Sequence, residues 1–232
     1  MRVYRGRADT IDGDRAVSER LVERVAADRE PAVRVWRPHR QVAFGRRDAR
    51  AEGYDRAREL ADERGFPPVE REVGGRAVAY TGSTVAFARV TPVTDSRSGL
   101  QDRYDAAAAD LLDALGSLGV DAREGEPPDS FCPGTHSVRA DCGGRPRKLA
   151  GLAQRVRADA AVVAGVLVVR DHGAIASVLD PVYRALDVSF DPETVGSVAR
   201  ADGRADPDAV VDAVEGALVD EAAGDTSVQR VG

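Results

Sequence analysis

Residues 145–155 read RPRKLAGLAQR, and the expectations for the rest of the chain start from this stretch. Among the 33 basic residues of the chain, Lys148 is the only lysine. An ammonium is a compact charge with three rotatable donors, whereas a guanidinium is a planar fork. A single lysine among arginines therefore indicates a position where the shape of the cation matters. The pattern predicts that Lys148 is catalytic or grips a substrate. The simpler alternative is a solvated lysine in a hairpin.

A second stretch, REVGGRAVAYTG at residues 71–82, contains a Gly-Gly pair between arginines. Glycine has no Cβ, so the backbone amides of such a turn can approach a ligand closely. Arg71 precedes Gly74 by three positions and Arg76 follows Gly75, and two guanidinium groups beside a turn suit an anion such as a phosphate. An ordinary structural turn would carry the same glycine pair.

The bulk composition limits the classes of protein that fit. With 232 residues, of which 43% are hydrophobic, the chain is long enough to bury a core. We expect one main domain over residues 1–200, and a linker, a C-terminal helix and a polar tail over residues 201–232. The formal net charge of -6 disfavours nucleic acid and anionic membranes as partners. The N-terminus lacks the apolar core of a signal peptide, and the longest apolar run, 160–169, is about half a membrane span. We therefore expect a soluble cytoplasmic protein.

Hydrophobic periodicity and turn residues predict a mixture of helices and short strands. The predicted helices cover residues 12–29, 51–64, 98–118, 172–186, 192–199 and 207–222. The predicted strands cover residues 32–36, 41–45, 68–72, 76–80, 83–91, 120–124, 135–140, 147–156 and 159–169. Three pairs of strands are expected to be neighbours or to be joined by a tight turn: 32–36 with 41–45, 76–80 with 83–91 around Gly82, and 135–140 with 147–156.

Together, the two motifs resemble the catalytic domain of the lipoate-protein ligase family, which is related to biotin-protein ligases and lipoyl (octanoyl) transferases. The first motif consists of Arg71, Gly74, Gly75, Arg76, Ala77 and Val78, and the second of Arg147, Lys148, Gly151, Ala153, Gln154 and Arg155. The segment VRVWRPHRQVAFGRRDA, residues 33–49, also resembles a strand, loop and strand of the family. The likeness covers about residues 13–185. It implies an α+β fold with a mixed, largely antiparallel sheet packed by helices, and a lipoate-ligase-like catalytic domain over residues 1–200.

The resemblance implies a reaction and roles for the motif residues. ATP, accompanied by Mg²⁺, would activate lipoate to lipoyl-AMP, and the lipoyl group would pass to a lysine of a lipoyl-domain acceptor protein. That acceptor would be a 2-oxoacid dehydrogenase E2 or a glycine-cleavage H-type protein. Lys148 would screen the two reacting anions. Arg71 would face the phosphate, and Gly74, Gly75, Arg76, Ala77, Gly151 and Ala153 would contact the adenylate and the acyl chain. No metal ligand of the protein is implied, and the short C-terminal region leaves room for a separate accessory subunit.

Several positions depart from the ligase pattern. Glu70 stands where ligases usually have a second arginine, Tyr80 follows Ala79 where a histidine often lies, and Ala164-Gly165 replaces a His-Gly pair. Gly-Gly-Arg is closer to the transferase branch. The Gly-Arg-Gly-Arg-rich segment of biotin ligases is missing from the sequence, so lipoate or octanoate ranks above biotin.

Cys132 offers a second interpretation. It lies in SFCPGTHSV, residues 130–138, ahead of the lysine segment, where cysteine-dependent octanoyltransferases of the superfamily carry their nucleophile. Cys132 could then accept an octanoyl or lipoyl group without ATP. The adjacent Pro133 and the short distance to the next strand favour an inert thiol instead. Cys132, His136 and Cys142 offer only three irregularly spaced ligands, which is a poor zinc site. A non-catalytic protein that binds an acyl-carrier domain is the third hypothesis.

Overall fold

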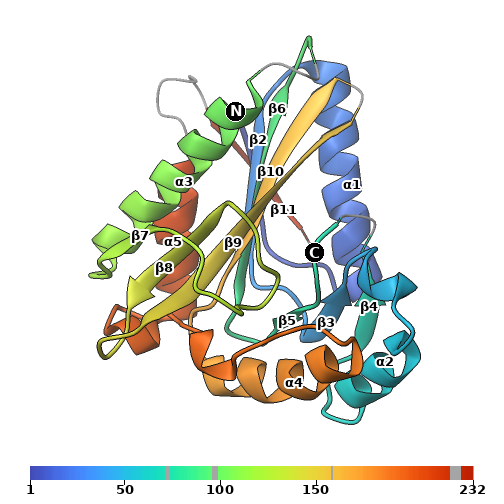
Figure 1. Ribbon diagram of the computed structural model, residues 1–232. Coiled ribbons are helices and arrows are strands. Elements are labelled where there is room, and N and C mark those ends of the chain that lie inside the picture. The colour runs from blue at the N-terminus through green and yellow to red at the C-terminus, as the bar shows by residue number, and fades with distance from the viewer. Residues whose placement is uncertain (72–73, 96–98, 158, 220–225, 232) are drawn as a thin grey trace.

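A large sheet forms the centre of the structure (Figure 1). The computed structural model describes residues 1–71, 74–95, 99–157, 159–219 and 226–231. Within these ranges eight strands pair in the order β11-β1-β2-β6-β10-β9-β8-β7. β1 pairs in parallel with β2 and β11, and the other neighbours are antiparallel. The strands are β1 (Arg2–Arg5), β2 (Ala32–Trp36), β6 (Val85–Pro92), β7 (Ala122–Glu124), β8 (Ser137–Asp141), β9 (Pro146–Arg157), β10 (Ala160–Leu167) and β11 (Ser227–Arg230).

A smaller sheet lies at one end of the large one (Figure 1). It contains three strands in the order β4-β3-β5, namely β4 (Pro68–Glu70), β3 (Gln41–Phe44) and β5 (Val78–Tyr80). The helices α2 (Tyr54–Asp62) and α4 (His172–Ala185) pack beside it. Their buried side chains, such as Ala57, Leu179 and Tyr183, share one apolar cluster with Phe44 and Val78 of the small sheet.

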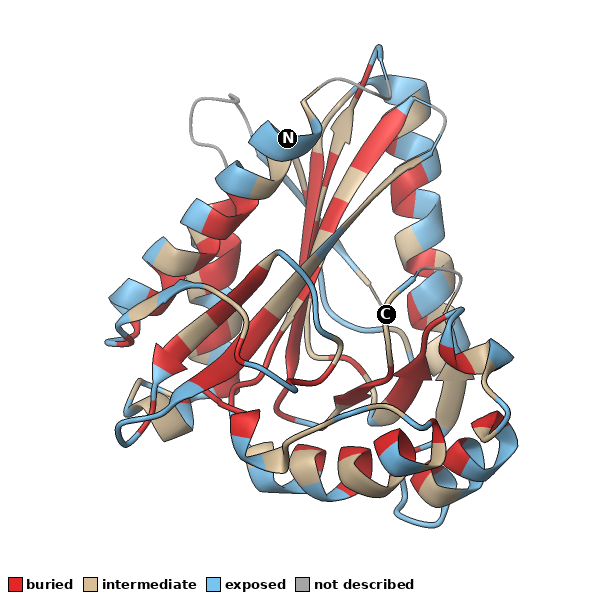
Figure 2. Ribbon diagram, in the orientation of Figure 1, coloured by how far each residue is buried: buried red, intermediate tan, exposed pale blue. Residues whose placement is uncertain are grey.

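Three helices cover the two faces of the large sheet. α3 (Leu100–Ser117) and α5 (Pro207–Leu218) lie on one face, where Leu111, Leu115 and Val214 pack against Val33 and Val35 of β2. α1 (Ile11–Asp28) lies on the other face, and its buried residues form a separate cluster with the large sheet. Figure 2 shows that buried segments line the inward side of each helix. Three short 3₁₀ helices, η1 (Asp48–Arg50), η2 (Pro192–Thr194) and η3 (Ala199–Ala201), complete the described elements.

This architecture confirms the predicted α+β class, but one of the predicted pairs of neighbouring strands is wrong. β2 and β3 lie in different sheets, because β1 and β6 occupy the two edges of β2. β5 and β6 are joined around Gly82, as predicted: the turn, where the Thr84 N–H donates to the Thr81 carbonyl, carries the chain from the small sheet to the large one. The predicted hairpin of β8 and β9 is also confirmed.

The C-terminal third contains further differences from the expectation. The predicted helix over 192–199 is replaced by η2 and η3, because Val195 between them bridges Lys148 and the Gly196 N–H donates to the Lys148 carbonyl over 2.8 Å. The expected polar tail contains β11, which extends the sheet beside β1. The predicted helix start at Ser98 and the predicted helix end at 220–222 lie outside the described residues. None of the described helices is long and apolar enough to cross a bilayer.

Candidate active site

A cleft of about 630 Å³ lies between the large sheet, α1, the small sheet and the loop that joins β7 to β8. Its floor is the face of the large sheet that points away from α3 and α5. Mostly small side chains cross this floor in two rows of paired residues from β2 to β9: Trp36, Ala86, Val166 and Gly151 in one, and Arg34, Ala88, Ala164 and Ala153 in the other. The floor is therefore largely apolar, and its mostly small side chains leave room above them. The volume of the cleft lies within the range of about 300–1,000 Å³ that small-molecule sites occupy.

Cys132 borders this cleft in the β7–β8 loop. Its backbone has a φ of 42°, in the left-handed region that residues other than glycine rarely adopt. Such strain persists only where neighbouring groups hold it, and it is concentrated at functional sites. The Sγ atom of Cys132 accepts hydrogen bonds from the backbone N–H of Arg76, at 3.3 Å, and from the guanidinium of Arg71, at 3.5 Å. Two donors are thus directed at one sulfur.

Two buried side chains hold the backbone of Cys132. The N–H of Cys132 donates to the hydroxyl of Tyr183 over 2.6 Å, and that hydroxyl donates in turn to the Ala77 carbonyl over 2.9 Å. The carbonyl of Cys132 accepts a hydrogen bond of 2.9 Å from Lys148. Tyr183 is 0% exposed and Lys148 is 1% exposed. Burial raises the pKa of Tyr183 well above its usual value, so its hydroxyl keeps the proton that it donates.

The ammonium of Lys148 is fully occupied by protein acceptors. It lies 3.1 Å from both carboxylate oxygens of Glu126, 3.0 Å from the carbonyl of Phe131 and 2.9 Å from that of Cys132. Four acceptors therefore share three donors. Burial lowers the pKa of Lys148, and the neighbouring carboxylate of Glu126 opposes this effect. Lys148 borders the cleft, but its charge is directed at the cysteine loop.

Glu126 joins both ends of that loop. Its carboxylate accepts hydrogen bonds from the hydroxyls of Ser130 and Ser137, from the Gly134 N–H at 3.2 Å, and from Lys148. A carboxylate with several donors of this kind fixes the groups around it. Glu126, which is partly exposed, and buried Lys148 therefore form an ion pair that supports the Cys132 loop.

The absence of a side chain at Gly75 lets the glycine turn approach Cys132 closely. Its φ is +89°, and a Cβ at this position would lie 2.9 Å from Cys132 Sγ and 2.9 Å from the guanidinium of Arg71. Gly45 allows the approach from the other side, because a Cβ there would lie 2.1 Å from the Gly75 carbonyl oxygen. Gly74, in contrast, would meet no atom within 4 Å. Only the second glycine of the pair is required by the contact with the thiol.

The two arginines of the turn have different partners within the protein. Arg71 donates to the Arg76 carbonyl over 2.6 Å, and its Nε is buried without a hydrogen-bond partner among the described residues. Arg76 pairs through its side chain with Asp48 at 3.2 Å, and Asp48 also accepts from the Gly45 N–H. Asp48 is 0% exposed, and burial raises its pKa while Arg76 and Gly45 oppose that shift.

Most of the predicted site residues are brought together. Seven of them line the one cleft: Arg71, Gly74, Gly75, Cys132, Lys148, Gly151 and Ala153. Two do not line it, since the Arg76 side chain is paired with Asp48 and Ala77 is 0% exposed with its carbonyl bonded to Tyr183. The sequence reasoning did not identify Glu126, Tyr183 or Asp48. Only Glu126 had a usable signal, as an acid in the loop six residues before Cys132.

The three cations predicted to hold phosphate fit that role poorly in this arrangement. Lys148 is bonded to Glu126, Arg76 to Asp48 and Arg71 to a backbone carbonyl. A phosphate would have to displace these partners, two of which are carboxylates that repel it. Among the described residues, no group of three or more His, Cys, Asp or Glu side chains is arranged to hold a metal ion.

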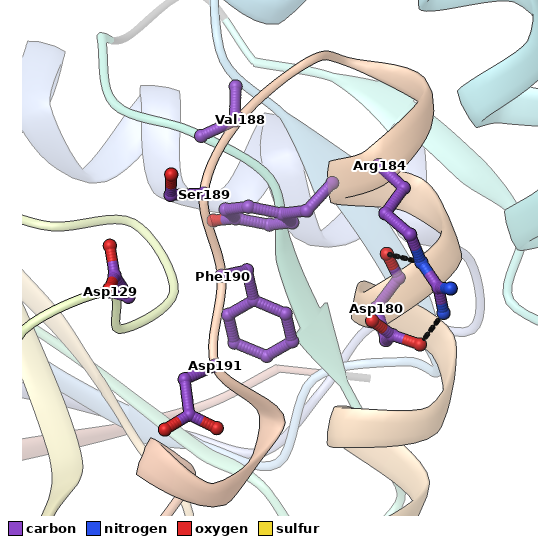
Figure 3. A pocket seen from close by; sticks show the side chains of 8 residues that line it. Asp129, Asp180, Arg184, Val188, Ser189, Phe190 and Asp191 are labelled. Carbon is purple, nitrogen blue, oxygen red and sulfur yellow. Dashed lines mark hydrogen bonds and ion pairs between the residues drawn. The ribbon is translucent and has the colours of Figure 1, made fainter.

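A second, smaller hollow of about 370 Å³ lies where α4 meets the segment after it. Figure 3 shows the paired Arg184 and Asp180 on one side of this hollow, with Asp129 and Asp191 opposite. The ring of Phe190 lies 4.9 Å from that of Tyr183, which separates this hollow from the cysteine loop. Three aspartates line it without an arrangement that suggests a ligand.

The fold agrees with what comparison with known families finds. The model of the lipoyl protein ligase A/B catalytic domain family matches residues 14–219. The chain therefore belongs to this family, as the two sequence motifs predicted.

Curated relatives carry transferase names. An octanoyl-[GcvH]:protein N-octanoyltransferase of Geobacillus kaustophilus (strain HTA426) is 30% identical over 149 residues, which cover 63% of this chain and 51% of that protein. A lipoyl-[GcvH]:protein N-lipoyltransferase of Listeria monocytogenes is 25% identical over 60% of this chain and 49% of that protein. The aligned part of the chain thus spans about half the length of these relatives.

Solved structures of ligases share the fold. A lipoate-protein ligase A bound with ATP superposes with a TM-score of 0.75 at 19% identity, covering 100% of this chain and 88% of that one. A putative lipoate protein ligase from T. acidophilum with bound lipoic acid gives a TM-score of 0.69 at 18% identity, covering 100% of this chain and 89% of that one. Similarity at this level of identity concerns the fold alone.

Proposed function

We propose that the chain is a cysteine-dependent acyltransferase of protein lipoylation. It would take an octanoyl or lipoyl group from one lipoyl-type carrier protein, hold it as a thioester on Cys132, and pass it to a lysine of another. The relatives from G. kaustophilus and L. monocytogenes support this assignment, because their names specify octanoyl or lipoyl transfer from GcvH to a protein. A glycine-cleavage H-type donor and a 2-oxoacid dehydrogenase E2 acceptor would fit the same chemistry.

The observation that carries the proposal is the arrangement around Cys132. A thiol in a strained left-handed conformation borders an apolar cleft, and buried Tyr183 and Lys148 hold its backbone. Sγ faces the N–H of Arg76 and the guanidinium of Arg71. An inert core thiol needs none of these contacts, whereas a nucleophile requires donors for the negative charge that develops on sulfur and on the attacked carbonyl oxygen.

The proposed transfer has two steps that balance. Cys132 Sγ attacks the carbonyl carbon of the acyl-lysine amide, so a C–S bond forms, the C–N bond breaks, and the thiol proton leaves with the donor's lysine amine. The acceptor's lysine amine then attacks the thioester, a C–N bond forms, the C–S bond breaks, and the amine proton returns to sulfur. The Arg76 N–H and the unpartnered Nε of Arg71 are the donors available to the carbonyl oxygen in both steps.

In this proposal Lys148 and Glu126 are positioning residues. Lys148 donates to the carbonyls of Phe131 and Cys132, and Glu126 accepts from Lys148 and from the Gly134 N–H, so the pair fixes the direction of the thiol without touching the acyl group. The second candidate is an ATP-dependent lipoate ligase, favoured by the shared fold of the ATP-bound lipoate-protein ligase A. It ranks second because Lys148 and Arg76 are already paired with carboxylates, and of the three cations only Arg71 has a nitrogen without a hydrogen-bond partner among the described residues. A structure from T. acidophilum is described as a bi-partite lipoate protein ligase. If this chain were a ligase, it could therefore also work with a separate accessory subunit.

The test is an acyl-transfer assay read by mass spectrometry on both carrier and enzyme. An octanoylated or lipoylated H-type protein is mixed with an unmodified lipoyl domain, with and without Mg-ATP and free lipoate. The proposal predicts transfer without ATP and a thioester on Cys132 that hydroxylamine removes. Cys132→Ser should abolish transfer, whereas the matched variant Cys142→Ser, whose thiol is buried elsewhere in the core, should retain it.

Two other results would refute the transferase. Acylation of the acceptor only with lipoate and Mg-ATP, undiminished in Cys132→Ser, would identify the ligase. If the acceptor is not acylated from any donor, even with an accessory subunit supplied, the remaining hypothesis is a non-catalytic protein that binds an acyl-carrier domain.

A further inference from the structure

The end of the cleft farthest from Cys132 is polar. Arg34 and Trp36 on β2 and Asp14 on α1 meet there, and all three border the cleft. Arg34 is 0% exposed, and its guanidinium carbon lies 4.2 Å over the ring of Trp36. Its Nη2 lies 2.6 Å from Asp14 Oδ1, so a buried ion pair closes the far end of an otherwise apolar floor.

The ion pair accounts for only part of this polarity. The terminal nitrogens of Arg34 donate to the carbonyls of Gly6 and Asp14, to the Ser18 hydroxyl and to Asp14 Oδ1, and these bonds fasten α1 to β2. Three further atoms are buried without a hydrogen-bond partner among the described residues: Arg34 Nε, Trp36 Nε1 and Asp14 Oδ2, the last of which lies 4.0 Å from His39 Nε2. Buried polar atoms are normally paired, and an unpaired one costs free energy, so three such atoms on neighbouring residues of one cleft require an explanation.

The strand order gives the backbone spacing across the floor of the cleft. β2 and β9 are separated by β6 and β10, which makes three strand spacings and about 14 Å. Cys132 lies at the β9 end, because its carbonyl is bonded to Lys148 of that strand. An extended chain advances roughly 1.2 Å per bond, so an eight-carbon acyl group on Cys132 would reach about 9 Å along the floor. The remaining distance of about 5 Å would be spanned by the side chains of Arg34 and Trp36, which border the cleft.

We infer that the cleft selects acyl groups that carry hydrogen-bonding heteroatoms at their distal end, as a lipoyl group does, over all-hydrocarbon chains such as octanoyl. This inference rests on the proposed function for the direction of the chain, since the carbonyl must face Cys132. The N–H groups of Arg34 and Trp36 would donate to the distal heteroatom, and Asp14 Oδ2 would accept from it when it carries a proton. A hydrocarbon end would leave all three atoms without partners and so bind less well.

The test compares four acyl groups on the same H-type carrier: lipoyl, octanoyl, 8-hydroxyoctanoyl and, as the length control, nonanoyl. We expect kcat/KM for formation of the Cys132 thioester to be about tenfold higher for 8-hydroxyoctanoyl than for nonanoyl, the size of one added hydrogen bond with a charged partner, and higher for lipoyl than for octanoyl. Trp36→Phe keeps the aromatic ring but removes one donor, and it should bring the 8-hydroxyoctanoyl to nonanoyl ratio closer to one. Equal rates for the polar and apolar chains in the wild type would overturn the inference.

A binding measurement separates this inference from the proposed function. Calorimetry on the Cys132→Ser chain with free lipoic, octanoic, 8-hydroxyoctanoic and nonanoic acids needs no chemical step. If no thioester forms with any donor, the transferase proposal fails, while tighter binding of the polar acids would still support a polar distal subsite. If a thioester forms and the acids bind with equal affinity, the transferase stands and the distal subsite is refuted.

Discussion

Gly75→Ala tests whether the glycine turn exists to meet the thiol. The added methyl would lie 2.9 Å from Cys132 Sγ and from the Arg71 guanidinium, and φ at +89° is strained for alanine. The backbone strain should cost about 1–3 kcal/mol of unfolding free energy, which lowers the thermal midpoint by roughly 2–12 °C in a domain of this size. Displacing the Arg76 N–H and Arg71 from the sulfur should slow formation of the Cys132 thioester by about 10²-fold or more, as for loss of an oxyanion-type donor.

Gly74→Ala is the matched control, because a methyl there would meet nothing within 4 Å. Two readouts compare the variants: thioester formation from an octanoylated carrier, and the rate at which iodoacetamide alkylates Cys132, with buried Cys142 as the internal reference in the same spectra. Gly74→Ala should match the wild type in both, and calorimetric midpoints report any loss of fold. If the two alanine variants react at the same rate, Gly75 has no special relation to the thiol, and the proposed geometry is wrong.

Three further outcomes follow from the groups that hold the loop. Tyr183→Phe leaves the Cys132 N–H and the Ala77 carbonyl unpaired, so urea unfolding should show a loss of about 1–3 kcal/mol together with slower acyl transfer. Burial raises the pKa of Tyr183 above the value near 10 of an unfolded tyrosine, so the folded chain holds this proton more tightly than the unfolded chain does. The free energy of unfolding should therefore fall as the pH rises above about 10, and it should fall less steeply with pH in Tyr183→Phe. Lys148→Met should cost about 3 kcal/mol because it strands the Glu126 carboxylate, and adding Glu126→Gln should restore part of that loss in the same unfolding assay.

The sequence predicted elements better than it predicted their partners. Runs such as 32–36 and 159–169 have the branched, apolar character of buried strands, and the structure has β2 and β10 there. The one wrong pair, 32–36 with 41–45, is adjacent along the chain but lies in two different sheets, and strand composition carries no information about which edge is free. β1 and β11 were missed. They are short, polar strands near one edge of the sheet, and their parallel partners lie far away along the chain.

The candidate site was predicted through its conspicuous residue types. A lone lysine, a glycine pair between arginines and a cysteine in a Pro-containing loop each stand out in the printed sequence. The supporting residues do not. Tyr183 lies on the buried face of α4, and before folding its hydroxyl cannot be distinguished from that of any packing tyrosine. Asp48 is 0% exposed beneath the glycine turn, although charged residues are rarely buried, so composition alone would place it on the surface.

The surroundings of Lys148 explain physically why this position holds a lysine in a chain whose other basic residues are arginines. Its ammonium meets two carboxylate oxygens and two carbonyls in a space where it is 1% exposed, and its Cε lies 3.4 Å from where a Cβ on Gly151 would be. Three rotatable donors can serve acceptors spread around one point, whereas a planar guanidinium is longer and directs its donors outward in a fixed fork. The same contacts that require a lysine also occupy its charge, so in the proposed transferase the residue that first suggested phosphate chemistry acts through the backbone of Cys132. Chemistry on the thiol follows from this arrangement more directly than chemistry on a nucleotide.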